Sequence, residues 1–240
     1  MNTLKINGTT LPDIFVDASL SFNKPQKKVE TIEIPGRNGA LVIDDGTYEN
    51  VIIKYPCYIH GDFETVFNDL LSFLAPLKGY LRIECSNDPD HFRQGRFIVP
   101  QTPVLQNINR FGRFDLAFDC KPQRWLISGE ESVVFSANGA ITNPTSFEAQ
   151  PLLIIGKNIA SSIVGDTSIT IVGATADTAI DCDLMDCYLK GSPGVGKNDI
   201  VSFSSNDFPK LMPGSNNISG TGLSPGAANS IEIVPRWWEL

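Results

Sequence analysis

Residues 29–59 read VETIEIPGRNGALVIDDGTYENVIIKYPCYI, and the first half of the chain is organised around them. Residues 29–34 alternate between two faces, which is the pattern of a half-buried strand. Pro35 and Gly36 then interrupt the alternation, because proline lacks an N–H for a strand ladder and glycine tolerates positive φ. The stretch therefore predicts a strand that ends in a turn at Pro35-Gly36.

Two further turn signals follow at short intervals. Residues 37–39 (RNG) mark a second turn and residues 44–46 (DDG) a third, with a strand predicted between them over 40–43. A longer strand is predicted over residues 51–59. Glycine turns this close together predict a long hairpin arm that projects from a sheet.

The predicted arm has little of its own against which to bury apolar side chains. Ile34, Leu41, Val42 and Ile43 need a partner, which is either the body of the same domain or another subunit. Both alternatives stay open at this point. The pattern favours a protein that assembles, and it makes Ile34, Arg37, Leu41 and Ile43 the candidate subunit-interface residues.

Charge is distributed unevenly along the 240 residues. Residues 1–126 hold 14 Lys and Arg against 15 Asp and Glu, whereas residues 127–240 hold 5 against 12. The shift predicts two domains, residues 1–127 and 128–240. An acidic second half argues against nucleic acid as a partner, because phosphate binding requires clusters of Lys and Arg.

The cysteines give no sign of a disulfide framework. There are five, an odd number, and none forms a CxxC pair that would indicate a zinc site. The N-terminal residues lack the apolar run of a signal peptide, and no stretch approaches the length of a membrane span. We expect a protein made in a reducing cytoplasm, without a membrane segment and without a cofactor.

One helix is predicted, directly after the arm. Asp62 is well placed as its N-cap, and Pro76 and Gly79 terminate it. Its apolar residues recur at helical spacing on one face: Phe63, Val66, Phe67, Leu70, Leu71 and Leu74. The helix is expected to cover one side of a sheet.

Arginines alternate with phenylalanines in the segment that follows. Arg93, Arg96, Arg110 and Arg113 are expected to point outward from strands whose phenylalanines face the core. Nearby aspartates cancel their charge, so a nucleic-acid surface is the weaker interpretation.

The second half is rich in Gly, Ser, Asn, Thr and Pro and shows no helical period. Strands are predicted over 147–156, 168–173, 178–184, 199–203 and 230–234. Many short strands separated by turn signals indicate a β-sandwich or barrel. In the last strand region, Ile231, Ile233 and Trp237 are expected to share a buried face.

No residue pattern predicts catalysis or metal binding. His60 and His91 lack the spacing of a triad or metal site. Asp181, Asp183 and Asp186 resemble a calcium loop only superficially. Strand alternation explains the stretch better, with Asp181 and Asp183 outward and Ile180, Cys182 and Leu184 inward. Residues 191–197 (GSPGVGK) have the glycine density of a phosphate loop but lack its pattern, so a hairpin turn is predicted.

Four stretches together resemble the distal tail (Dit) proteins of phages with long non-contractile tails. They are FVDASLSFNKPQKKVETIEIPGRNGALVID at 15–44, KPQRWL at 121–126, NPTSFEAQPLLIIG at 143–156 and IEIVPRWWEL at 231–240. The order and spacing of these motifs carry the resemblance, which is spread over the whole chain.

The resemblance implies a mainly β fold in two parts. Residues 1–127 would form a β-sandwich or split barrel with one α-helix, related to tail-tube proteins, and residues 128–240 a galectin-like jelly-roll β-sandwich. It implies no enzyme activity.

The resemblance also implies a role and partners. Six copies would form a homohexameric ring at the virion tail tip, between the tail-tube protein and the tail-associated hub protein of the baseplate. A receptor-binding protein for host attachment is a further possible partner. The alternative function is a carbohydrate-binding module of a phage tail component.

Overall fold

The computed structural model describes residues 2–17, 23–98, 104–106, 111–224 and 229–240. The chain divides into two compact units. The first runs to Arg124 and also includes Leu240, and the second runs from Trp125 to Glu239. Within the described ranges, no helix combines the length and apolar composition needed to span a bilayer.

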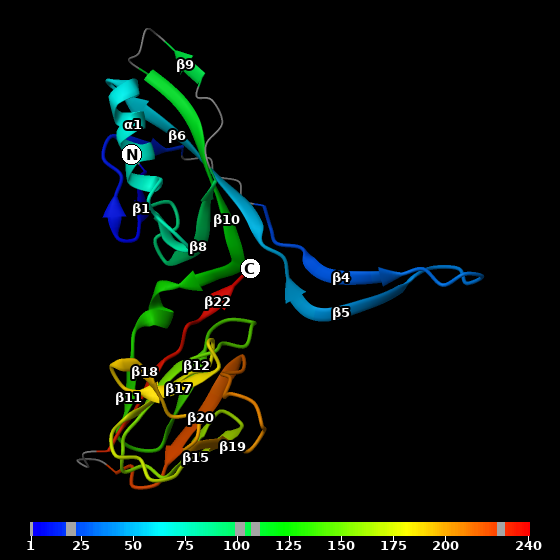
Figure 1. Ribbon diagram of the computed structural model, residues 1–240, viewed down its shortest axis with the longest axis vertical. Helices are drawn as coiled ribbons and strands as arrows, with labels where there is room; N and C mark the ends of the chain where they lie inside the picture. The colour runs from blue at the N-terminus through cyan, green and yellow to red at the C-terminus, as the bar shows by residue number, and fades with distance from the viewer. Residues whose placement is uncertain (1, 18–22, 99–103, 107–110, 225–228) are drawn as a thin grey trace. The chain divides into compact units, whose positions relative to one another are not determined.

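In the residues that the structure describes, the first unit contains one helix and a large antiparallel sheet. Its elements are β1 (Leu4–Ile6), β2 (Thr9–Thr10), β3 (Ile14–Val16), β4 (Lys27–Ile32), β5 (Leu41–Tyr48), β6 (Val51–His60), α1 (Phe63–Leu74), β7 (Leu81–Cys85), β8 (His91–Ile98), β9 (Val104–Gln106) and β10 (Phe111–Leu126). The sheet follows the order β2-β1-β7-β8-β10-β6-β3, with β9 also paired to β10. Strands β4 and β5 pair only with each other (Figure 1).

The sheet curls back toward its own beginning. An isolated antiparallel bridge joins Asn2 to Val16, and the Val16 N–H donates to the Asn2 carbonyl over 2.9 Å. Asn2, two residues before β1, thereby pairs with β3, the last strand of the path. A single sheet that curls in this way is a split barrel, so of the two expected architectures for this part the barrel is confirmed and the sandwich is not.

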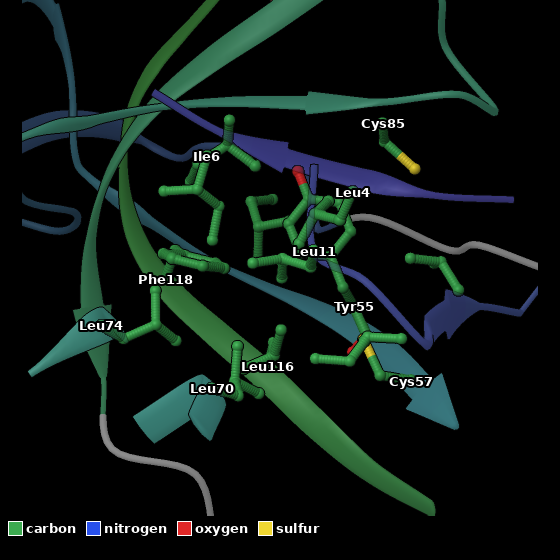
Figure 2. Close-up of a cluster of buried hydrophobic side chains, with 14 of the residues drawn as sticks. Leu4, Ile6, Leu11, Tyr55, Cys57, Leu70, Leu74, Cys85, Leu116 and Phe118 are labelled. Carbon is green, nitrogen blue, oxygen red and sulfur yellow. The ribbon is translucent and has the colours of Figure 1, made fainter. Parts of the chain in front are cut away.

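Alternating side chains fill the interior of this curled sheet. In β6, Val51, Ile53, Tyr55, Cys57 and Ile59 are buried while the residues between them face outward, as the period of a strand requires. Figure 2 shows Tyr55 and Cys57 among the side chains of this core, with Phe118 and Leu116 from β10.

The helix is confirmed with the predicted start. The Asp62 carboxylate accepts hydrogen bonds from the Thr65 N–H at 3.4 Å and from the Thr65 hydroxyl at 2.7 Å. Phe63, Leu70 and Leu74 are buried against the sheet. The Phe63 ring lies over Gly112 of β10, so a Cβ atom at this position would require the ring to move.

The prediction that all the arginines of this region point outward is wrong for Arg93. Its side chain is buried on the inward face of β8, because Arg93 lies directly opposite the core residue Ile83 of β7, and opposed residues share a face of the sheet. Arg96 and Arg113 are exposed as predicted, and Arg110 lies outside the described residues.

The second unit is built from short strands and one 3₁₀ turn. Its elements are η1 (Ile127–Glu130), β11 (Val133–Phe135), β12 (Gly139–Asn143), β13 (Leu152–Ile155), β14 (Ser161–Val164), β15 (Thr167–Ile171), β16 (Thr178–Asp181), β17 (Asp186–Leu189), β18 (Ser192–Gly196), β19 (Val201–Phe203), β20 (Gly214–Gly220), β21 (Ile231–Val234) and β22 (Trp238–Glu239). One sheet has the order β11-β21-β13-β16-β17-β18 and the other β12-β20-β14-β15-β19.

Both sheets of the second unit contribute to one core. Leu153, Ile180 and Ile233 come from the first sheet, and Ile169 and Ile218 from the second. The predicted sandwich is confirmed, as is the shared buried face of Ile231, Ile233 and Trp237.

The C-terminal segment closes the second unit through backbone contacts. The Leu126 N–H donates to the Trp237 carbonyl over 2.9 Å, and the Arg236 N–H donates to the Gly129 carbonyl over 2.7 Å. A Cβ atom on Gly129 would lie 2.4 Å from the Trp237 nitrogen, so this close approach requires glycine.

Strand alternation fails at the end of β16. Asp181 is buried, with 4% of its surface exposed, and Leu184 is 70% exposed, the reverse of the prediction for both. The strand ends at Asp181, and Met185 adopts a left-handed conformation with φ of 54°, so Leu184 lies in the turn that follows. The buried carboxylate is accommodated because Arg236 pairs with it.

Candidate assembly site

The arm formed by β4 and β5 is the candidate assembly site (Figure 1). The strands pair antiparallel, with Glu30 opposite Ile43 and Ile32 opposite Leu41. Directly opposed residues share a face of a two-stranded ribbon. Ile32, Leu41 and Ile43 therefore lie together on one face of the arm.

The second face of the arm is also apolar in part. Thr31 is opposite Val42, and Val29 is opposite Asp44, so both valines lie on this face. Val42 is 60% exposed and Ile43, on the first face, 46%. Neither face is covered by the described residues of the first unit, so within that part of the chain the arm does not fold back onto its own domain.

A bulge at the base of the arm replaces the turn predicted at residues 44–46. The register shifts between Lys27, opposite Tyr48, and Val29, opposite Asp44. Strand β5 therefore continues through residues 44–46. Between these two pairs it contains residues 45–47, whereas β4 contains only residue 28, so β5 has two extra residues there. The prediction of a turn here was wrong because glycine at a bulge and glycine at a turn give the same sequence signal.

Two carboxylates fix the conformation of the bulge. Asp44 accepts hydrogen bonds from the Lys27 ammonium and the Gly46 N–H, both at 2.8 Å, and Asp45 accepts one from the Thr47 N–H at 2.9 Å. The hydrogen bond from Lys27, followed by that from Gly46, holds the pKa of Asp44 below its ordinary value. The ion pair also raises the pKa of Lys27.

The tip of the arm is a tight turn. The Arg37 N–H donates to the Ile34 carbonyl over 3.1 Å, with Pro35 and Gly36 between them, and Gly36 has φ of 81°. Proline followed by glycine with positive φ is the arrangement of a type II turn. Ile34 remains 39% exposed, and among the described residues the Arg37 side chain forms no ion pair.

The structure distributes the four predicted interface residues over two places. Leu41 and Ile43 lie on one face of the ribbon, and Ile34 and Arg37 lie in the turn at its tip. Sequence reasoning missed Val29 and Ile32, which are 48% and 39% exposed. Their alternation was visible in the sequence, but only the separation of the arm from the sheet shows that both faces are open.

The other residues considered for chemistry lie apart and have structural contacts. His91 is hydrogen-bonded to Asp88 over 2.7 Å, and the His60 ring makes an edge-to-face contact with the ring of Tyr58. Residues 191–197 include the turn between β17 and β18, so the predicted hairpin is confirmed. In the part of the chain that the structure describes, no three acidic, cysteine or histidine side chains are grouped to hold a metal ion.

All five cysteines are buried and act as apolar core residues. Burial raises the pKa of Cys57 to about 12, and that of Cys120 to about 12 as well. The thiolate form that would react or bind metal is therefore strongly disfavoured.

Known proteins resemble this chain in sequence over its first half and in structure over its whole length. Residues 3–120 match the family of the phage tail protein RIFT-related domain. None of the curated proteins matches the chain.

Two solved structures share the fold. The crystal structure of the Dit protein of phage SPP1 matches with a TM-score of 0.70 at 15% identity and covers 100% of both chains. A chain of the phage P2 baseplate, in its activated conformation, matches with a TM-score of 0.53 at 10% identity over 97% of each chain. Residues 3–120 thus match the phage tail protein RIFT-related domain, and the chain shares over its whole length the fold of a Dit distal tail protein.

Proposed function

We propose that this chain is a structural protein of the distal phage tail, not an enzyme, and that six copies form a ring. The family match of residues 3–120 and the Dit-like fold of the whole chain support a tail protein. The main support for assembly is the arm, because it exposes aliphatic side chains on both of its faces.

Exposed aliphatic surface on a projecting ribbon is costly in a monomer. Covering it stabilises a complex by about 25 cal/mol per Å² of apolar area removed from water. The two outer edges of the ribbon also present backbone groups that can pair with another chain. An arm that lies on the next copy makes a heterologous contact, and such contacts close into a ring when the rotation permits.

We assign the ring contacts to residues 1–127, with Ile34, Arg37, Leu41 and Ile43 at the interface. Residues 128–240 form the second, galectin-like part of the adaptor. The solved SPP1 protein is described as part of a hub adsorption apparatus, and the P2 match comes from a baseplate. By analogy, the ring joins the tail-tube protein to the hub protein at the virion tail tip, after assembly in the host cytoplasm.

Sedimentation velocity of the full chain tests assembly. Replacing Ile32, Leu41 and Ile43 by Thr removes the apolar face and places a β-branched residue, which favours a strand, at all three positions. We expect wild type to form a ring in a concentration-dependent manner and the triple variant to remain monomeric, with an unchanged melting temperature.

A matched control removes exposed valines far from the arm in sequence. Val134 is 56% exposed and Val172 68%, and both lie in the second unit. The Val134→Thr, Val172→Thr variant should assemble as wild type does. A wild-type protein that stays monomeric at every concentration, or a triple variant that assembles normally, contradicts the proposal.

A further inference from the structure

A groove in the first unit runs between α1 and the segment that joins β1 to β3. It has a volume of about 270 Å³. Its apolar lining comes from Leu11, Ile14, Val66, Leu70 and Phe73. We call it the α1 groove.

Two carboxylates border the α1 groove. Asp13 precedes β3, and Asp69 lies on α1 next to Leu70. Both are exposed, and among the described residues neither forms an ion pair. The groove thus combines an apolar interior with an unneutralised negative border.

The tip of the arm has the complementary chemistry. It carries one exposed aliphatic side chain, Ile34, and one cation without an ion pair, Arg37, three residues apart across a tight turn. Ile34 keeps 39% of its surface exposed, so its own copy does not bury it. The tip therefore has an exposed aliphatic side chain and a positive charge, and the α1 groove has an apolar lining and a negative border that could bind them.

We propose that the arm tip of one copy occupies the α1 groove of the next copy in the ring, with Ile34 in the groove and Arg37 beside Asp13 and Asp69. This inference rests on the ring assembly proposed above and names its contact. The size fits, because an apolar cavity of about 150 Å³ already accommodates benzene. Arg37 then pairs with carboxylates at the edge of an apolar contact, where the pairing selects the partner and fixes the orientation.

Charge reversal tests the contact. In Arg37→Asp the tip repels the groove, and in Asp69→Arg the groove repels the tip, so each variant alone should need roughly tenfold higher concentration to assemble. A one-to-one mixture should assemble again, because each tip then meets a groove of opposite charge on the other variant. Matched controls are Lys78→Asp and Asp90→Arg, exposed positions that do not line the groove.

Cysteine cross-linking tests the same contact without altering charge. Native thiols are buried, so cysteines introduced at Ile34 and Val66 are the accessible ones. Disulfide formation requires Cβ atoms about 3.5–4.5 Å apart. Mixing chains that carry only Ile34→Cys with chains that carry only Val66→Cys should give covalent dimers under mild oxidation, whereas either chain alone should give none.

The outcomes separate this inference from the ring itself. If wild type assembles and neither charge reversal nor cross-linking has the expected effect, the ring stands and the α1 groove is not its contact. If wild type never assembles, both proposals fail. Should a charge variant fail to fold, as judged by its thermal transition, the cross-link decides: inter-chain dimers support the contact and their absence overturns it.

Discussion

Arg236 forms a bidentate ion pair with the buried Asp181: Nη1 donates to Oδ1 over 2.7 Å and Nη2 donates to Oδ2 over 2.8 Å. The same carboxylate accepts hydrogen bonds from the backbone N–H groups of Asp183, at 3.1 Å, and Leu184, at 3.2 Å. One ion pair thus connects the C-terminal segment to the turn that follows β16, and both lie within the second unit.

Removing Arg236 should destabilise the second unit strongly. The Arg236→Met variant leaves a carboxylate without its counter-charge in a site where only 4% of Asp181 is exposed. Breaking a buried pair from one side costs about 3–5 kcal/mol. Urea unfolding should show this loss in the free energy of unfolding of the second unit.

The matched control for Arg236→Met is Lys190→Met. Lys190 lies 3.4 Å from Glu232 in an exposed ion pair of the same unit. Its removal should cost less than about 1 kcal/mol. Equal losses of unfolding free energy for the two variants would show that the buried ion pair stabilises the unit no more than the exposed one.

The Asp181 pair should make stability depend on acid pH. Burial by itself raises the pKa of Asp181, but the hydrogen bonds and charge of Arg236 outweigh it, and the pKa lies below its ordinary value. A folded pKa below the unfolded value of about 3.9 gives stability that is present above pH 4 and is lost as pH falls through the folded pKa.

Thermal unfolding of wild type and Asp181→Asn between pH 7 and pH 3 measures this contribution. Other carboxylates titrate in both proteins, so the difference between the two pH profiles isolates Asp181. The profile of the variant should be the flatter one, and parallel profiles would contradict the prediction.

Gly112→Ala should destabilise the first unit. The added Cβ atom would lie 2.1 Å from the Phe63 ring, so the ring and the start of α1 must move. Overpacking of this kind costs about 1–3 kcal/mol. Gly194→Ala is the control, because no atom lies within 4 Å of a Cβ atom there, and its melting temperature should match wild type.

The thiols of the folded protein should not react with a thiol reagent near neutral pH. All five are buried, and burial raises the pKa of Cys187 to about 12, as it does for Cys57 and Cys120. Ellman's reagent at pH 8 should detect no rapid reaction in native protein and five thiols in denaturant. Fast reaction of any native cysteine would contradict the buried assignment.

Local signals in the sequence were sufficient for the helix and for the long alternating strand β6. The helix follows from Asp62 as a cap and from apolar residues at helical spacing, and β6 follows from strict alternation. These patterns act over a few residues, so they do not depend on where the element lies in the fold. The turn at Pro35-Gly36 follows in the same way, because it depends only on the φ preferences of two neighbouring residues.

Tertiary structure decided which side chains are buried where distant segments meet. Asp181 is buried because Arg236, 55 residues away, neutralises it, and Arg93 turns inward opposite Ile83. The bulge at residues 44–46 depends on pairing with β4, and the α1 groove requires α1 to lie beside the segment before β3. No local pattern contains these contacts, because burial is set by the partner across the fold and not by the neighbour in the chain.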